Sequence, residues 1–188
     1  SINWPIIQGE SRTGLTVFWP DEGLDTGPIL LQKQVDIAPD DTMGSLYFDK
    51  LFPLGVDAMA EAVDMVRDGT ASRTVQDESQ ATYEGWCRPE DVIIDWGRPS
   101  GEIYNLMRGS DPSPGAETTY RGVKIRFYGT ESRRDAAGRR PGEVTEVSDR
   151  GFAVVAQRGS LLVRRVQPGG ERKVAASEWA ASTGLTVG

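Results

Sequence analysis

The chain contains no histidine and only one cysteine among its 188 residues. Without histidine it lacks the commonest general base and the commonest metal ligand of proteins. Cys87 on its own can form neither an internal disulfide nor a cysteine-built zinc site. The sequence also lacks a secretory signal and any apolar run of about 20 residues, the length that spans a bilayer. These absences predict a cytoplasmic protein without a metal centre or a membrane partner.

Charge is distributed unevenly along the chain. Residues 1–99 contain 18 acidic and 7 basic side chains, whereas residues 100–188 contain 10 acidic and 14 basic ones. Such asymmetry predicts two units with different surroundings. The excess of four positive charges in the second unit fits either a nucleic-acid partner or an ordinary solvated surface. The five tryptophans and five tyrosines are scattered, unlike the stacking platform that binds single-stranded nucleic acid.

The first part of the chain predicts a mixture of helices and strands. Apolar spacing and β-branched runs indicate a helix, two strands and a long helix, over residues 2–9, 13–19, 28–37 and 40–69. Asp40, Asp41 or Thr42 could cap the start of the long helix. Pro53 should kink or split it, and Gly69 is a natural stop. The polar stretch 70–80 is the best linker. We therefore expect one unit over residues 1–80 and a second over residues 81–188.

The second unit predicts mainly short strands. A strand over residues 92–96 and a helix over 98–109 precede four alternating segments, at residues 120–129, 142–147, 151–157 and 161–167. Strands at this spacing favour a small closed barrel. A basic loop separates the first two of them and carries Arg133, Arg134, Arg139 and Arg140. This loop could be an ordinary solvated loop, or it could bind a phosphate or an RNA backbone.

A tight acidic turn, "DEGLDTG", lies between the first two strands. Metal binding is disfavoured, because a calcium loop starting at Asp21 would have Gly23 at its third position and Gln32 at its twelfth. The turn also fits simple punctuation, with glycines at positive φ and aspartates capping local donors. A third interpretation is catalytic. Open α/β sheets place their sites after the carboxyl ends of buried strands, and Asp25 follows such a strand.

Five stretches resemble one family: "INWPIIQGE", "FWPDEGLDTGPILLQK", "ATYEG", "IDWGRPSGEIYNLMRGSDPSPGAET" and "RPGEVTEV". Together they resemble the folate-dependent formyltransferases. The resemblance is greatest to the hydrolase domain of 10-formyltetrahydrofolate dehydrogenase, and methionyl-tRNA and amino-sugar formyltransferases are also similar. It implies an α/β fold, with part of a Rossmann-like formyltransferase domain followed by a small OB-like β-barrel. It also implies formyl transfer from the co-substrate 10-formyltetrahydrofolate to water or a small amine.

The resemblance assigns roles to residues of the acidic turn. Asp25 matches the family's catalytic aspartate, which orients and charges a histidine. Phe18 and Trp19 would lie on the strand beneath the turn. Tyr83 would stand at the edge of the pocket, although it could equally pack the two units together. The positions that match the folate-binding loop are Asp21, Glu22, Gly23 and Leu24.

One departure from the family is large. The family's asparagine and histidine lie upstream of the "INW" helix, and this chain has no histidine, so it cannot hold the complete site. We expect it to correspond to the C-terminal two-thirds of a formyltransferase, with a sheet edge and an apolar face exposed. Two alternatives stay open: a methionyl-tRNA formyltransferase, and an incomplete fragment or binding module. Arg108 is expected to pair with a carboxylate near the boundary between the units.

Overall fold

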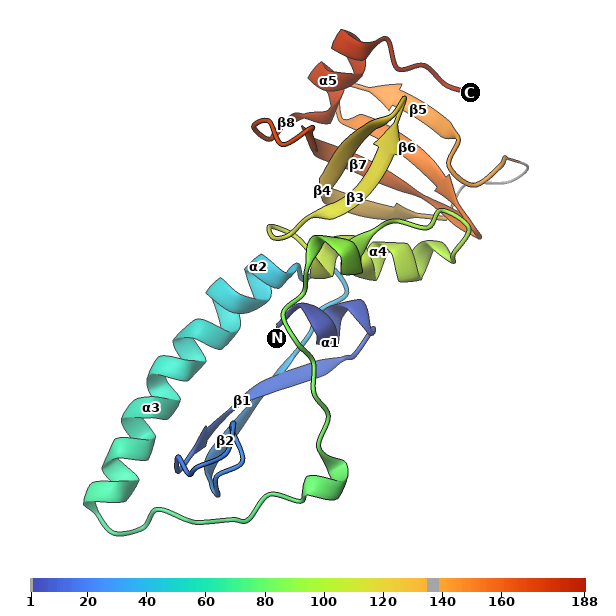
Figure 1. Cartoon of the computed structure of the whole chain (residues 1–188). Helices are drawn as coiled ribbons and strands as arrows, with labels where there is room; N and C mark the ends of the chain where they lie inside the picture. The colour runs from blue at the N-terminus through green and yellow to red at the C-terminus, as the bar shows by residue number, and fades with distance from the viewer. Residues whose placement is uncertain (1, 135–138) are drawn as a thin grey trace.

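The computed structural model describes residues 2–134 and 139–188, so the centre of the predicted basic loop lies outside the described residues. Figure 1 shows two parts. At one end a hairpin lies beside a long helix, and at the other a larger antiparallel sheet carries the last helix. Two short helices, α1 (Asn3–Ile7) and α4 (Ser100–Gly109), lie between these parts. The confirmed fold class is therefore mixed α/β.

The first half forms the elements that its pattern predicts. A two-stranded antiparallel hairpin, β1–β2, follows the first helix, and a bulge at Val17/Phe18 shifts its register near the turn. The elements in chain order are α1 (Asn3–Ile7), β1 (Arg12–Phe18), β2 (Ile29–Asp36), α2 (Met43–Ser45), the π-helical turn η1 (Leu46–Leu51) and α3 (Phe52–Arg67).

The long helix begins and ends where its sequence signals predict. Thr42 caps it, accepting a hydrogen bond from the Ser45 backbone, while the Ser45 hydroxyl accepts one from the Thr42 backbone. Gly69 follows its end with a φ of +69°. The helical run continues through Pro53, but its hydrogen-bond pattern is divided just before that residue, since η1 ends at Leu51 and α3 begins at Phe52. Pro53 lies in the first turn of α3, after the π-helical turn, where a missing backbone N–H is tolerated.

One face of α3 packs on the hairpin. Ala58 and Ala62 are buried there, and the Leu15 side chain lies beside Gly55. Lys33 of β2 adds an ion pair to Glu61 of α3, with Nζ 2.7 Å from Oε2. Small residues on this face of the helix therefore bring it against the two strands.

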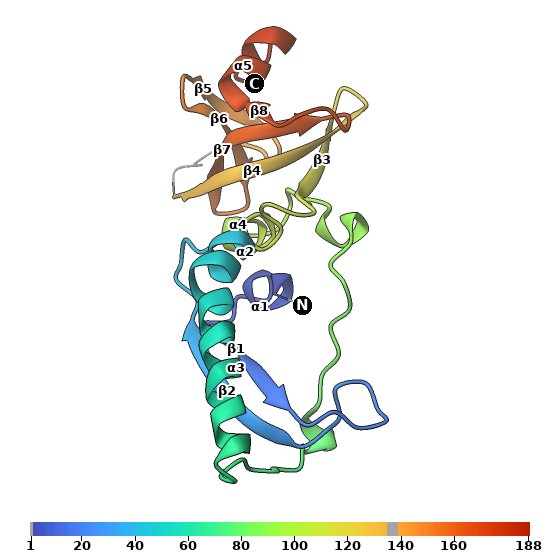
Figure 2. The same cartoon turned by 90° about the vertical axis from the view of Figure 1, so that its left-hand side faces the viewer.

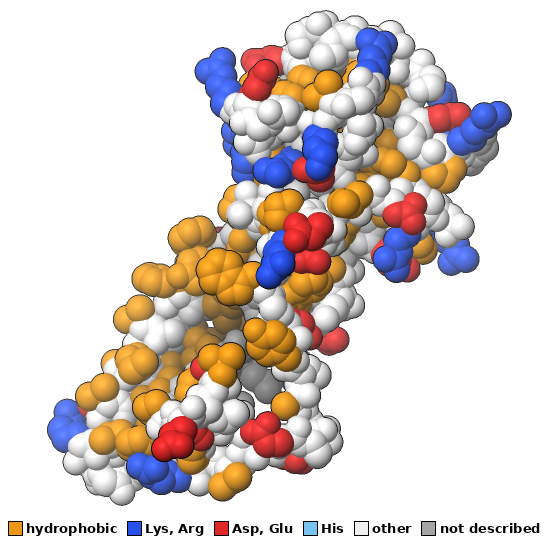
Figure 3. All heavy atoms as spheres, viewed as in Figure 1, with side chains coloured by type: hydrophobic (Ala, Val, Ile, Leu, Met, Phe, Trp, Pro, Cys, Tyr) orange, Lys and Arg blue, Asp and Glu red, His pale blue; other side chains and the backbone are white. Residues whose placement is uncertain are grey.

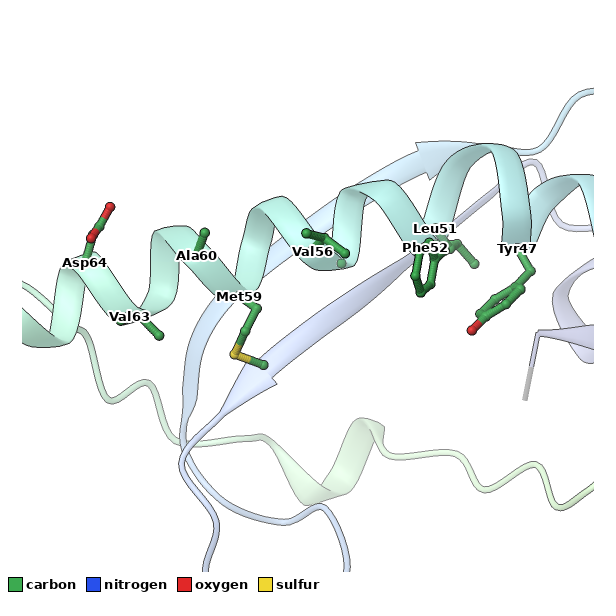
Figure 4. A pocket seen from close by; sticks show the side chains of 9 residues that line it. Tyr47, Leu51, Phe52, Val56, Met59, Ala60, Val63 and Asp64 are labelled. Atoms are coloured by element: carbon green, nitrogen blue, oxygen red, sulfur yellow. The ribbon is translucent and has the colours of Figure 1, made fainter.

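The neighbouring face of α3 is apolar and exposed. It lines a groove of about 700 Å³, shown in Figure 4. In Figure 3 hydrophobic side chains gather along this side of the molecule. The sequence predicts an exposed apolar face on an incomplete sheet, whereas the apolar face that is exposed here lies on a helix. Its large exposed side chains, which continue into η1, are Phe48, Phe52, Val56, Met59, Val63 and Val66.

The second half contains short helical turns, α4, a six-stranded sheet and a terminal helix. The strand order along the sheet is β3-β4-β7-β6-β5, with β8 paired to β7. No pairing joins β3 to β5 among residues 2–134 and 139–188, so the closed, OB-like barrel stays a prediction. The elements are η2 (Glu78–Gln80), η3 (Pro89–Val92), α4 (Ser100–Gly109), β3 (Ala116–Tyr120), β4 (Val123–Arg133), β5 (Val144–Ser148), β6 (Gly151–Ala156), β7 (Gly159–Pro168), β8 (Val174–Ala175) and α5 (Ala176–Thr183).

Three sequence predictions for this half are wrong in detail. The strand over residues 92–96 is a 3₁₀ turn followed by one isolated bridge at Ile93, because this stretch meets the edge of β3 at one point only. The strand over residues 120–129 is divided by a turn at Arg121–Gly122, where both residues have positive φ. The basic loop is shorter than predicted, because β4 continues through Arg133, which binds Glu146 of β5.

A buried arginine joins the two halves. Arg108 of α4 is only 6% exposed, and its Nη1 donates to the carbonyls of Ala38 and Asp41 at 3.1 and 2.9 Å. Burial lowers the pKa of Arg108. Arg108 therefore binds backbone carbonyls, and the prediction that it pairs with a carboxylate is wrong. The Asp41 carboxylate binds Lys50 instead, at 2.6 Å, and also accepts the Ala38 N–H.

The exposed face of α3 predicts dye binding. The double variant Val56→Thr, Met59→Gln should bind less of the hydrophobic dye ANS than wild type, because it removes exposed apolar surface. Its unfolding free energy should change by less than about 0.5 kcal/mol. The contrasting variant Ala58→Gln, on the buried face, should lose about 1–3 kcal/mol through overpacking. Unchanged dye fluorescence in the double variant would contradict the exposure of this face.

Candidate functional site

The acidic turn is held partly by its own side chains. Asp21 Oδ1 accepts hydrogen bonds from the Gly23 N–H and the Thr26 hydroxyl, at 3.0 and 2.8 Å. A Cβ at Gly23 would lie 2.0 Å from the Thr26 hydroxyl oxygen, so this packing requires glycine. Asp21 therefore acts here as the local cap expected of a turn aspartate.

Asp25 stands in a backbone conformation that is uncommon for a residue with a side chain. Its φ is +57°, in the left-handed region that aspartate tolerates better than most residues. The residue is exposed, and its carboxylate makes no hydrogen bond within the described part of the chain. Two residues later, a Cβ at Gly27 would lie 1.7 Å from the Trp19 carbonyl oxygen. The packing therefore requires glycine at Gly27, whereas the backbone at Asp25 would also accept asparagine or glycine.

The predicted linker does more than connect the units: residues 72–76 attach to the base of the turn, and we call them the clamp segment. Ile29 and Thr74 exchange two backbone hydrogen bonds, of 2.7 and 3.0 Å. The indole N–H of Trp19 donates to the Ser72 carbonyl at 2.8 Å, and the Arg73 guanidinium lies 4.1 Å from the centroid of the Trp19 ring. The start of β2 thus gains a short backbone partner outside the hairpin.

Gln76 completes this attachment. Its side-chain Nε2 donates to the carbonyl of Asp25 at 2.8 Å and to that of Gly27 at 2.7 Å. These two bonds fasten the last turn of the acidic loop to the clamp segment. The sequence analysis missed Gln76, because a polar stretch without apolar periodicity gave no signal for such a contact.

A cleft of about 740 Å³ opens between the acidic turn and the chain that follows the clamp segment. Figures 1 and 2 show this chain as an extended arc that returns from the far end of α3 towards α4. The arc is fixed near α1, where the Trp4 indole N–H donates to the Gly85 carbonyl at 2.7 Å. The residues that line the cleft are Leu24, Asp25, Thr26, Ile29, Gln76, Asp77, Glu78, Gln80, Ala81, Thr82, Tyr83 and Glu84.

The cleft brings together three residues that the sequence analysis singled out. Leu24, Asp25 and Tyr83 all line it, although Tyr83 is 58 positions from Asp25 in the sequence. Leu24 and Tyr83 are 76% and 82% exposed. The other three predicted folate-binding positions, Asp21, Glu22 and Gly23, lie in the same exposed turn but outside the lining. The roles of all six residues stay predictions.

The cleft carries acidic and neutral polar groups. Besides Asp25, the acidic residues Asp77, Glu78 and Glu84 line it. Hydrogen bonds from the Ser79 hydroxyl and backbone N–H lower the pKa of Asp77 and keep it ionised. Within residues 2–134 and 139–188, no group of three or more acidic or cysteine side chains could hold a metal ion. The surroundings therefore suit a ligand that presents hydrogen-bond donors rather than a phosphate.

Comparison with known families assigns this fold. Residues 87–184 match the family described as "Formyl transferase, C-terminal domain", and residues 1–63 match "Formyl transferase". The chain belongs to the formyl transferase family. The predicted division at residues 80 and 81 lies between the two matched regions of this formyl transferase chain and stays a prediction.

Curated relatives are longer than this formyl transferase chain. It is 39% identical over 190 residues to the mitochondrial 10-formyltetrahydrofolate dehydrogenase of Mus musculus, covering 95% of this chain and 20% of the relative. It is 35% identical over 187 residues to the methionyl-tRNA formyltransferase of Syntrophus aciditrophicus, covering 100% and 60%. The chain thus spans about a fifth to three-fifths of the length of these relatives.

Solved structures share the fold. HypX from Aquifex aeolicus, solved with tetrahydrofolic acid, superposes with a TM-score of 0.80 at 19% identity, over 99% of this chain and 33% of that one. An N-formyltransferase from Helicobacter canadensis, solved with folinic acid and dTDP-3-aminofucose, gives a TM-score of 0.66 at 20% identity, covering 86% and 59%. Among the residues described here, no helix is long and apolar enough to cross a membrane.

The half-buried Cys87 is not suited to act as a nucleophile. Burial first, and the nearby Asp91 carboxylate second, raise the pKa of the Cys87 thiol to about 11. At pH 8 its thiolate fraction should be about 250-fold below that of an ordinary thiol with a pKa of about 8.5. The rate of alkylation by iodoacetamide should therefore keep rising with pH up to about 11. Asp91→Asn should lower that midpoint, and a midpoint near 8.5 in the unmodified protein would contradict this account.

Proposed function

We propose that this chain forms part of an enzyme that passes the formyl group of 10-formyltetrahydrofolate to water or to a small amine. The observation that carries the proposal is the cleft where Leu24, Asp25 and Tyr83 meet, in a chain of the formyl transferase family. Its volume of about 740 Å³ lies in the ordinary range for small-molecule sites. The single cysteine supports a reducing location such as the cytoplasm.

The reaction sets clear requirements. Water or an amine attacks the formyl carbon and loses a proton, and a tetrahedral oxyanion forms. The bond between the formyl carbon and N10 then breaks, and N10 takes a proton. The products are tetrahydrofolate and either formate or a formamide. Fixed donors must stabilise the oxyanion, and a base must accept the proton of the attacking group.

Asp25 is the residue of this chain that we assign to proton transfer. An ionised carboxylate orients an imidazole and stabilises its charged form, as the acid does in hydrolytic triads. Because the chain contains no histidine, the imidazole must come from outside these 188 residues. The folate ring would lie against the turn at Leu24, with Tyr83 at the opposite edge of the cleft.

Replacing the acid tests this role. The test uses the natural gene product. There, Asp25→Asn keeps the size of the side chain and removes its charge. Formyl release should fall at least about a hundredfold, as expected when general acid–base catalysis is lost. The affinity for tetrahydrofolate should change by less than about threefold, because the cleft lining is retained. Turnover and binding should be measured on the same preparation.

A matched control separates this effect from a general loss of charge. Asp57 is an exposed carboxylate on α3, away from the cleft, and Asp57→Asn should leave turnover unchanged. Melting curves of both variants should match wild type. Near-wild-type turnover in a folded Asp25→Asn protein would remove Asp25 from the mechanism.

A methionyl-tRNA acceptor remains the second candidate. It is favoured by the excess of basic residues after position 99 and by the 35% identity to a methionyl-tRNA formyltransferase. Salt separates the two, because phosphate contacts make nucleic-acid binding fall steeply with ionic strength. Activity on a small acceptor should vary little between 50 and 200 mM salt. A fall of about a hundredfold or more, seen only with tRNA as acceptor, would favour the second candidate.

A further inference from the structure

The acidic turn has few contacts with the rest of the protein near Asp25. Residues 21–26 are all exposed, and the bonds made by Asp21 stay within the turn. The contacts that reach the Asp25 and Gly27 carbonyls come from one side chain, that of half-buried Gln76. Its amide donates both of its hydrogens, one to each carbonyl. The clamp segment is itself anchored by the backbone pair of Ile29 and Thr74.

We propose that Gln76 is a positioning residue of the formyl-donor site, which holds the Asp25 turn in its left-handed conformation and so directs the carboxylate into the cleft. The inference rests on the function proposed above, since it concerns the orientation of Asp25. The direction of the Asp25 side chain follows from its backbone, and the φ of +57° is kept only where the surroundings hold it. An amide that grips the carbonyls of Asp25 and Gly27 is such a restraint.

The loss of these bonds should affect catalysis more than binding. Each neutral hydrogen bond contributes about 1 kcal/mol, so the turn would become mobile while the protein stays folded. A carboxylate displaced by about 1 Å can cost about a hundredfold in rate, and a partly mobile one costs less. The remainder of the cleft lining is untouched, so folate should still bind.

The first experiment compares the kinetics of formyl release for two variants of the natural gene product. Gln76→Met keeps the side-chain length but has no donors, and kcat for formyl release should fall about tenfold, with KM for the formyl donor changed less than about threefold. Val75→Glu is the matched control, because Val75 is 82% exposed, lies next to Gln76 and does not line the cleft. It should keep wild-type kcat. An unchanged kcat in Gln76→Met, or an equal fall in Val75→Glu, would overturn the proposal.

The second experiment restores one donor by protonation. Gln76→Glu is nearly isosteric, but its carboxylate cannot donate to the two carbonyls, whereas its protonated form can donate to one. The ratio of its kcat to that of wild type should therefore rise as the pH falls from 7 to 5. The neighbouring carboxylates of Asp25, Asp77 and Glu78 are the same in Val75→Glu, whose ratio should stay flat. A flat ratio for Gln76→Glu would contradict the restraint by hydrogen bonds.

A third measurement does not depend on turnover. Cleavage after Glu22 by a glutamate-specific protease should be several-fold faster in Gln76→Met than in wild type and in Val75→Gln, a control that adds no glutamate, because cleavage follows local opening. If wild type neither bound nor used the formyl donor while this difference appeared, the proposed function would fail and the clamp would stand. Equal cleavage rates in the three proteins would overturn the clamp, whatever the activity.

Discussion

The candidate site depends on the attachment of residues 72–76 to the start of β2. The exchange of hydrogen bonds between Ile29 and Thr74 holds the start of the arc of residues 76–85 opposite the acidic turn, and the bond from Trp4 to Gly85 holds its other end. The same attachment brings Gln76 to the carbonyls of Asp25 and Gly27. The backbone pairing and the Gln76 amide therefore act together on the two walls of the cleft.

The rest of the fold supports this arrangement from a distance. The buried Arg108 connects α4 to the carbonyls of residues 38 and 41, which fixes the chain just before α2. Breaking such a buried charge-assisted contact is costly, because the guanidinium would be left without partners. The apolar groove along α3 lies elsewhere and shares no lining residue with the cleft. The groove and the cleft are thus separate surfaces of one chain.

Local signals predicted much of the fold, and long-range contacts account for most of what was missed. Thr42 and Gly69 mark the helix ends because capping depends on a few neighbouring residues. The strand predicted at residues 92–96 does not form, because the stretch pairs with the edge of β3 at a single residue. Its apolar composition gave no sign of this. The terminal helix α5 was missed, and so was Gln76, whose partners lie about 50 positions away. Asp25 was identified through the family resemblance, because the sequence of its turn alone is equally typical of an ordinary structural turn.

The central claim is that the cleft between the acidic turn and residues 80–84 binds the folate. Hydrogen–deuterium exchange with and without 5-formyltetrahydrofolate, in the polypeptide made from the natural gene, tests it most directly. Bound ligand should slow exchange at the backbone amides of residues 22–27 and 80–84, and leave β4 and β7 unchanged. Protection confined to the C-terminal sheet, or none at the cleft when the ligand is bound, would contradict the account.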